Sequence, residues 1–258
     1  MNYELKNIPQ RPEKPRDNGL TMVMDKGLGL KEAELFIDSS AHLTDVIKLG
    51  FGTSYISNNL KEKIKLYKQA GLKVYVGGTL FEAFIVRNMF DDYQKLIDNL
   101  GLNMAEVSDG SLEINHDKKC EYINKLSKQV TVVSEVGSKE EGIIIHPSKW
   151  TTMMKKELEA GSWKVIAEAR ESGNVGIYHT NGKTHTILID KIIAKIKVEN
   201  IIWEAPIKSQ QTWFIKQFGS NVNLGNIGVQ DVVALETLRL GLRGDTFFQF
   251  LPKELLKK

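Results

Sequence analysis

Four glutamates in this chain each close a short apolar run, at Glu106, Glu135, Glu168 and Glu204. They lie 29, 33 and 36 residues apart, which is close to the length of one strand–helix unit of a parallel barrel. Carboxylates at the same place in successive units meet at the C-terminal mouth of such a barrel, where barrel enzymes hold their chemistry. Gathered carboxylates repel one another unless a divalent cation, a lysine or an arginine lies among them. The spacing therefore predicts a site and indicates a metal in it.

Cationic side chains are expected at the same mouth. Lys48 stands between two apolar residues of a short run, so strand alternation turns it away from the helix-covered outside and into the barrel. There it would bind phosphate or carboxylate or act as an acid–base group, and a purely structural buried ion pair is the alternative. Arg170 shares a strand face with Glu168 and would grip an anion or pair internally. Of Asp25 and Lys26 at the end of the first run, only one can point inward.

Glycine-containing segments follow two of the apolar runs. Gly77-Gly78-Thr79 offers backbone N–H groups to an anion, although a plain tight turn explains it equally well. The segment Asn223-Leu224-Gly225-Asn226-Ile227-Gly228 stands where phosphate-binding barrels place an anion loop, before the last helix. Ser108 shares the face of Glu106. We therefore expect these residues to contact substrate.

The elements that position these residues alternate regularly. We expect strands at 20–24, 45–49, 73–77, 103–107, 130–136, 163–168, 200–204 and 221–224. We expect helices near 30–40, 60–70, 91–100, 115–128, 149–160, 184–196, 208–218 and 229–240. Eight such units predict a single (β/α)8 TIM barrel over 19–258, after an extended N-terminal arm over 1–18 that contains three prolines. An open doubly wound sheet is the alternative, but Asp25-Lys26-Gly27-Leu28-Gly29 lacks the dinucleotide-binding glycine spacing.

Composition narrows the class of protein. The chain has 258 residues, the size of one barrel, and its 35 basic and 32 acidic residues give a net charge of +3, too balanced to indicate nucleic acid. The single Cys120 excludes an intrachain disulfide and a cysteine metal cluster. No apolar run is long enough to span a membrane, and the polar N-terminal stretch lacks the apolar core of a signal peptide. We expect a cytoplasmic protein without a membrane partner.

Several longer motifs occur together, in one order along nearly the whole chain. They are Lys14-Pro15-Arg16, Asp25-Lys26-Gly27, Lys48-Leu49-Gly50-Phe51-Gly52-Thr53-Ser54, Gly77-Gly78-Thr79-Leu80-Phe81-Glu82, Glu106-Val107-Ser108-Asp109-Gly110, Ser134-Glu135-Val136-Gly137, Glu168-Ala169-Arg170-Glu171-Ser172-Gly173, Glu204-Ala205-Pro206, Lys208-Ser209-Gln210-Gln211, Val222-Asn223-Leu224-Gly225-Asn226-Ile227 and Leu242-Arg243-Gly244-Asp245-Thr246. In these motifs, over about 14 to 250, the chain resembles the phosphosulfolactate synthase family, whose reaction opens one route to coenzyme M.

The resemblance implies a barrel that adds sulfite to C3 of phosphoenolpyruvate with magnesium, giving (2R)-2-O-phospho-3-sulfolactate. It also implies a homo-oligomer, for which a trimer is the suggested order. Under this hypothesis carboxylates among Glu106, Glu135 and Glu168 hold Mg²⁺. Lys139 matches the family lysine expected to be the general acid. One departure is that Ser138 stands where the family usually has the first of two consecutive lysines.

Within this hypothesis Lys48 and Arg170 hold the anionic groups, with Lys48 as the second catalytic lysine. Two other functions remain open. One is a Schiff-base aldolase on the same barrel, using Lys48 or Lys139 and no metal. The other is a non-catalytic barrel protein associated with heat stress, as some plant relatives are named.

Overall fold

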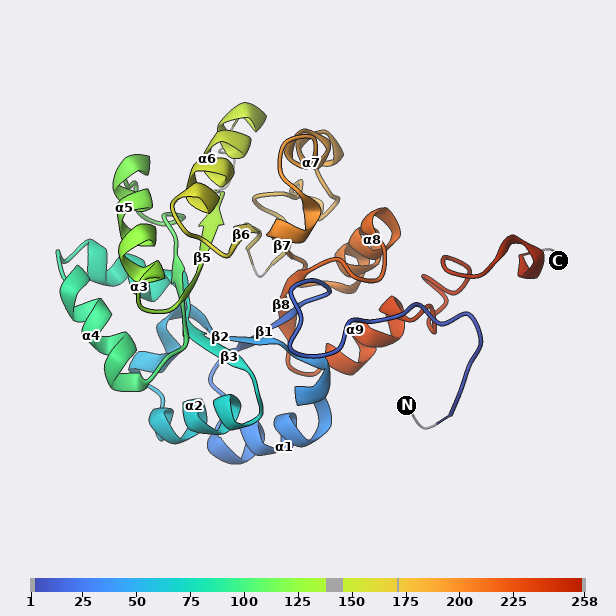
Figure 1. Ribbon diagram of the computed structural model, residues 1–258, viewed down its shortest axis with the longest axis horizontal. Helices are drawn as coiled ribbons and strands as arrows, with labels where there is room; N and C mark the ends of the chain where they lie inside the picture. The colour runs from blue at the N-terminus through green and yellow to red at the C-terminus, as the bar shows by residue number, and fades with distance from the viewer. Residues whose placement is uncertain (1–2, 138–145, 171, 257–258) are drawn as a thin grey trace.

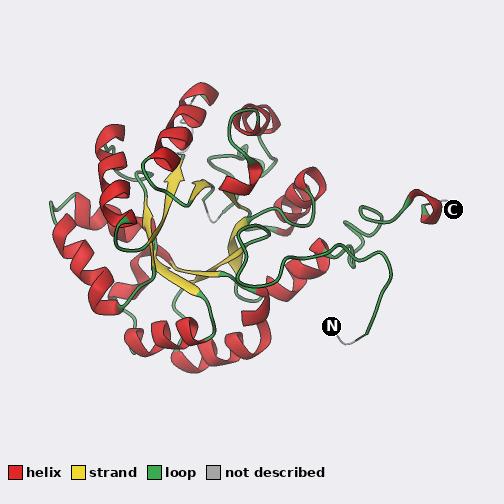
Figure 2. Cartoon of the chain, viewed as in Figure 1, coloured by secondary structure: helices red, strands yellow, loops and turns green. Residues whose placement is uncertain are grey.

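Eight parallel strands form the centre of the computed structural model, which describes residues 3–137, 146–170 and 172–256 (Figures 1 and 2). They are β1 (Thr21–Asp25), β2 (Val46–Leu49), β3 (Lys73–Val76), β4 (Met104–Val107), β5 (Thr131–Val136), β6 (Lys164–Ala167), β7 (Ile201–Glu204) and β8 (Leu224–Gly228). Their hydrogen-bonded order is β3-β2-β1-β8-β7-β6-β5-β4. At the seam β3 lies beside β4, and the backbone N–H of Val74 donates to Asn103 Oδ1 at 2.8 Å. The predicted (β/α)8 TIM barrel is confirmed.

Helices follow the strands and cover the outside of the barrel (Figure 2). In the described chain they are α1 (Leu30–Ser40), α2 (Leu60–Gln69), α3 (Gly78–Ile85), α4 (Phe90–Leu100), α5 (His116–Ser127), α6 (Pro147–Glu159), α7 (Thr186–Ile193), α8 (Lys208–Phe218) and α9 (Val232–Arg239). Short 3₁₀ helices add η1 (Ala41–Leu43), η2 (Gly50–Tyr55), η3 (Val198–Asn200) and η4 (Lys253–Leu255). The sequence prediction missed α3, because it begins on a glycine and has only eight residues.

The eighth strand was predicted wrongly. It was expected at 221–224 with a glycine loop after it, but the strand itself spans Leu224–Gly228. Gly225 in this strand packs too closely for a larger residue, because a Cβ there would lie 2.4 Å from Met22 Cε. Asn226 has a φ of 56°, and the register between β1 and β8 shifts at this place. Turn-forming residue types therefore mark a bulged strand here, not a loop.

Alternation along the strands stacks two layers inside the barrel. The lower layer is an apolar cluster that includes Met22, Val46, Tyr75, Met104, Val133, Ile166 and Ile202. Two residues further along the same strands or their ends stand Met24, Lys48, Gly77, Glu106, Glu135, Glu168 and Glu204. Residues i and i+2 share a strand face, so the apolar layer closes the barrel below and the charged layer faces the C-terminal mouth.

The first and last described segments of the chain lie on the α9 side of the barrel (Figure 1). Residues 3–18 contain no helix or strand, and Arg16 ties them to Asp45 at the start of β2, with Nη2 and Oδ2 2.9 Å apart. After α9 the chain runs through turns to η4, carrying exposed Phe247 and Phe248. Within the described residues no helix is long and apolar enough to cross a bilayer.

Candidate active site

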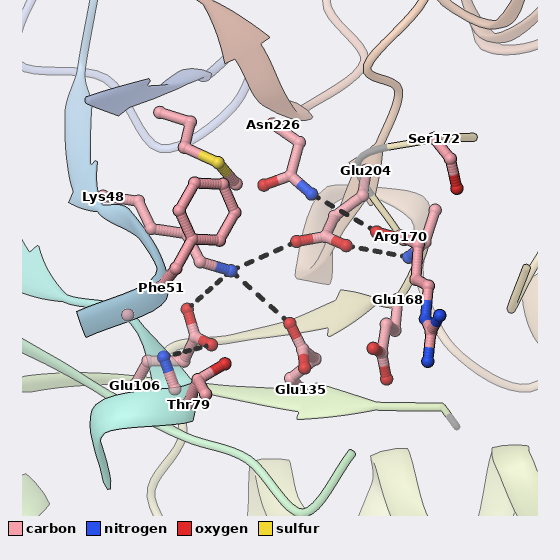
Figure 3. A pocket seen from close by; sticks show the side chains of 14 residues that line it. Lys48, Phe51, Thr79, Glu106, Glu135, Glu168, Arg170, Ser172, Glu204 and Asn226 are labelled. Atoms are coloured by element: carbon pink, nitrogen blue, oxygen red, sulfur yellow. Dashed lines mark hydrogen bonds and ion pairs between the residues drawn. The ribbon is translucent and has the colours of Figure 1, made fainter. Parts of the chain in front are cut away.

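A cavity of about 270 Å³ opens at the C-terminal ends of the strands. It is lined by Met24, Lys48, Phe51, Gly77, Gly78, Thr79, Glu106, Glu135, Glu168, Ala169, Arg170, Ser172, Glu204 and Asn226 (Figure 3). The four glutamates therefore do converge, as the sequence predicted. Three of them come from β4, β5 and β7, and Glu168 follows β6 directly.

Lys48 is the centre of the carboxylate cluster. Its Nζ lies 3.1 Å from Glu106 Oε2, 3.3 Å from Glu204 Oε1 and 3.5 Å from Glu135 Oε2 (Figure 3). Burial by itself would lower the pKa of Lys48, but the surrounding carboxylates outweigh it and hold that pKa well above its ordinary value. The side chain is therefore an ammonium at neutral pH. The prediction that Lys48 points into the barrel is confirmed.

The paired glycines after β3 serve the carboxylate cluster directly. The backbone N–H of Gly78, the first residue of α3, donates to Glu106 Oε1 at 2.9 Å. A Cβ on Gly78 would lie 2.2 Å from Glu106 Oε1 and from Ser108 Oγ, so no larger residue fits without displacement. The anion that this N–H meets is thus a side chain of the protein itself. Both Glu106 oxygens are engaged, one by Gly78 and the other by Lys48.

Glu204 is a site residue to which the sequence prediction gave no role. It is 1% exposed, and its Oε2 accepts from the backbone N–H of Ala169 at 2.7 Å. Burial raises the pKa of Glu204 from 4.5 to about 7, against the opposing effect of Lys48 and with a further raising contribution from Glu135. Its spacing from Glu168 was the available signal, since it continues the series begun at Glu106.

Arg170 and Asn226 also line the cavity (Figure 3). Arg170 is exposed at the rim and, among the residues that the structure describes, makes no ion pair. The alternative of an internal pair with Glu168 is therefore not formed. Asn226 Nδ2 donates to the Ala169 carbonyl at 3.3 Å, and the bulge in β8 aims this side chain at the cavity.

Four predicted substrate-binding residues lie elsewhere. Ser108 is buried and donates from Oγ to Glu82 Oε1 at 2.5 Å. Asn223 precedes β8, at the opposite end of the barrel, where its Oδ1 accepts from the Leu20 N–H at 3.1 Å. Gly225 packs inside the barrel against Met22. Lys26 lines a neighbouring cavity of about 390 Å³ between the ends of β1 and β8.

Neither residue at the end of β1 points into the main cavity, contrary to expectation. Asp25 turns outward, where its Oδ2 lies 2.8 Å from Lys63 Nζ and 3.0 Å from Tyr67 Oη. Met24 takes the inward position. The prediction for Lys139 falls outside the described residues.

A buried lysine supports Glu135 from behind. Lys119, on α5, donates from Nζ to the Glu135 carbonyl at 2.6 Å. The same Nζ lies 2.8 Å from Asp109 Oδ1 and 2.9 Å from Glu157 Oε1. Burial would lower the pKa of Lys119, and these two carboxylates reverse that effect and raise it. The carboxyl end of β5 is thereby fixed by a charged group that does not enter the cavity.

Carboxylate oxygens are the ligands that Mg²⁺ takes in proteins, commonly one or two with water in the other positions. Within the described residues no group of three acidic, histidine or cysteine side chains is arranged to hold a metal ion. Glu135 and Glu168 both line the cavity. Their carboxylates have the donor chemistry that magnesium takes with one or two protein ligands.

Comparison with known proteins bears on the whole chain. The family model for (2R)-phospho-3-sulfolactate synthase (ComA) matches residues 9–245. The chain is 38% identical over 251 residues to a phosphosulfolactate synthase of Bacillus subtilis (strain 168), covering 96% of this chain and 100% of that one. It is 40% identical over 244 residues to a phosphosulfolactate synthase of Methanothermobacter thermautotrophicus, covering 92% and 95%. The 3-hexulose-6-phosphate synthase of Salmonella typhimurium is similar in fold alone, with a TM-score of 0.56 and 13% identity over 87% of this chain and 100% of that one.

Proposed function

This chain belongs to the (2R)-phospho-3-sulfolactate synthase family, whose members form a C–S bond, and we propose that its substrates are phosphoenolpyruvate and sulfite. The observation that carries this proposal is the cavity at the barrel mouth. It is lined by four glutamates, three of which lie within 3.5 Å of the Lys48 ammonium, with Arg170 at its rim. Such a site suits a reaction in which negative charge builds up beside a carboxylate.

The donor chemistry of the cavity supports a divalent cation in it. Its lining carries several carboxylates beside Lys48 and Arg170, and carboxylate oxygens are ligands that Mg²⁺ takes. A divalent cation among them would also favour the binding of an anionic enol phosphate. We propose that Glu135 and Glu168 hold Mg²⁺, which supplies Lewis-acid stabilisation of the carboxylate oxygens when it is bound.

The protein's own residues have separate roles in the proposed reaction. The sulfur lone pair of sulfite forms the bond to C3, and the C2–C3 π electrons move to C2 and its carboxylate. Arg170 binds an anionic group of the substrate at the rim by a bidentate contact. The Lys48 ammonium stabilises the charge that develops, because its raised pKa keeps it protonated. Lys139 then gives C2 the proton that completes the product.

The direct test is incubation of the purified protein with phosphoenolpyruvate, sulfite and Mg²⁺, with ³¹P NMR and mass spectrometry of the product. We expect phosphosulfolactate, and its loss when EDTA is added. Replacing Lys139 by alanine should lower turnover about a hundredfold or more, whereas Lys155→Ala, an exposed lysine on α6, should leave it unchanged. Absence of product from the folded wild-type protein would reject the proposed substrates. Product that still forms in the presence of EDTA would reject the role of magnesium but not the proposed substrates.

The Schiff-base alternative is disfavoured by the state of Lys48. A Schiff base forms from a neutral amine, and the carboxylates around Lys48 raise its pKa and hold it as an ammonium. Borohydride treatment in the presence of pyruvate, a ketone that can form such an imine, should therefore leave the mass of the protein unchanged. A covalent adduct on Lys48 or Lys139 would support the aldolase hypothesis instead. The non-catalytic alternative makes no use of the clustered carboxylates.

We further propose a homo-oligomer, with a trimer as the suggested order, and a cytoplasmic location. The exposed apolar side chains of the C-terminal segment support the first, because Phe247 and Phe248 are about half exposed. Light scattering after size-exclusion chromatography tests the order directly. The single cysteine, Cys120, accords with a reducing compartment.

A further inference from the structure

Phe51 has a backbone conformation that favours glycine. Its φ is 50° and its ψ is 22°, in the left-handed region, and Gly52 beside it has a φ of 75°. A bulky side chain is disfavoured there because its Cβ crowds the neighbouring backbone. Strained residues of this kind cluster at active sites and ligand-binding sites. The conformation of Phe51 therefore suggests a functional role in addition to the folding of η2.

Burial does not supply that explanation. The Phe51 side chain is 51% exposed, so much less apolar area is removed from water than for a core phenylalanine. Its ring instead lines the active-site cavity, on the side of Lys48 (Figure 3). A glycine at this position would satisfy the backbone without strain. What phenylalanine adds is the ring at the cavity.

The ring is part of a small apolar wall in a charged cavity. Among the described lining residues, the apolar side chains are those of Met24, Phe51 and Ala169. Met24 packs under the same turn, since a Cβ on Gly50 would lie 3.1 Å from Met24 Cγ and Sδ. Met24 and Phe51 thus form a wall where the ends of β1 and β2 meet. The remaining lining is largely charged or polar.

The proposed substrate has one part that suits such a wall. Its phosphate and carboxylate require cations or N–H donors, whereas the C3 methylene carries no charge. Burying that methylene against apolar side chains is favourable, and burying an anionic group there is not. Resting on the proposed function, we propose that Phe51 is a specificity-determining residue. Its ring and Met24 contact the C3 methylene at its edge, in the plane of the double bond, and so disfavour an in-plane substituent on C3, whereas sulfite adds from the face of the double bond.

The test compares kcat/KM for phosphoenolpyruvate and for its 3-methyl analogue, with sulfite and Mg²⁺. The wild-type protein should strongly prefer phosphoenolpyruvate. Phe51→Ala removes the ring and keeps the strained backbone, and Phe51→Gly removes both. Both should narrow the preference by about tenfold or more, the size of effect that one methyl group has in an apolar pocket. Phe51→Leu, which keeps an apolar side chain, should narrow it less.

Tyr55→Ala is the matched control, because Tyr55 belongs to η2, is 86% exposed and does not line the cavity. It should retain the wild-type preference. Thermal unfolding shows whether each variant is folded. The Tm of Phe51→Gly should be no lower than that of Phe51→Ala, because glycine adopts the positive φ without strain. If Phe51→Ala does not fold, the glycine and leucine variants decide.

The outcomes separate this inference from the proposed function. An active wild-type protein whose Phe51→Gly and Phe51→Ala variants keep the wild-type preference would overturn the role of Phe51 and leave the proposed function intact. A uniform fall in activity on both substrates would likewise overturn the role in specificity. A wild-type protein that makes no product from phosphoenolpyruvate would remove both.

Discussion

At the scale of single residues, the site is governed by how charge is buried. Lys48 remains charged in the interior because three carboxylates lie within 3.5 Å of its Nζ. Each of them is almost fully buried, and none would be tolerated there without the ammonium. The cluster is therefore interdependent, and removal of one member leaves another uncompensated. Burial of charge is unfavourable even within this cluster, because it raises the pKa of Glu204 to about 7.

The raised pKa of Glu204 predicts a pH dependence of stability. Between pH 4.5 and about 7 Glu204 binds more protons in the folded protein than in the unfolded chain, so its contribution to the free energy of unfolding falls as the pH rises through this window. The contribution is at most about 3 kcal/mol, since one pKa unit corresponds to about 1.4 kcal/mol. Glu204→Gln should flatten the slope, whereas the exposed Glu34→Gln should not. Urea unfolding at pH 5 and pH 7.5 measures the change in the free energy of unfolding with pH. If Glu204→Gln shows the same change as the wild-type protein, the raised pKa of Glu204 is contradicted.

At the scale of elements, two departures from a regular barrel shape the site. The short helix α3 begins directly after β3 and points its first N–H at Glu106. The bulge at Asn226 bends β8 and turns an amide toward the cavity. Both depend on small or conformationally tolerant residues at strand ends, where the chain approaches its neighbours closely.

Gly78→Ala is the sharpest test of the first departure. The new Cβ would meet Glu106 Oε1 and Ser108 Oγ at 2.2 Å, so α3 or Glu106 must shift. We expect a loss of about 1–3 kcal/mol of stability, typical of overpacking, together with reduced kcat/KM because Glu106 moves relative to Lys48. Gly244→Ala is the control, since its Cβ would meet no atom within 4 Å. Thermal unfolding and steady-state kinetics measure both, and a Gly78→Ala protein of normal stability and activity would refute the close contact.

At the scale of the whole molecule, charged side chains at the bottom of the barrel bind the backbone before β8 and fasten the N-terminal arm to the barrel. Arg239 is fully buried, and burial holds its pKa well below the ordinary value. It donates from Nη1 to the carbonyls of Ser220 at 2.6 Å and Val222 at 2.7 Å. Arg11 Nε lies 2.8 Å from Glu236 Oε1. Stability is thereby concentrated at one end of the barrel and chemistry at the other, as in barrel enzymes generally.

This separation predicts that Arg16→Ala will lower stability without lowering turnover. Arg16 donates three hydrogen bonds to Asp45, from Nε to Oδ1 at 2.9 Å and to Oδ2 at 3.1 Å, and from Nη2 to Oδ2 at 2.9 Å. Breaking a buried pair by removing one partner costs about 3–5 kcal/mol. Arg87→Ala, at an exposed arginine, should cost little. Urea unfolding and kcat at a permissive temperature measure the two effects. A fall in kcat for the folded Arg16→Ala protein would show that the arm influences the site.

Sequence by itself determined the barrel, the inward direction of Lys48 and the convergence of the four glutamates. These follow from local periodicity and from a spacing that repeats with each strand–helix unit, and both are properties of the chain in one dimension. Tertiary structure alone decided that Gly78 serves Glu106, that Asn223 lies at the opposite end of the barrel and that Met24, not Asp25 or Lys26, faces the cavity. It also decided where β8 begins, because a bulge against β1 shifts the register. Such facts depend on contacts between segments far apart in sequence, and no local pattern encodes which atoms will meet there.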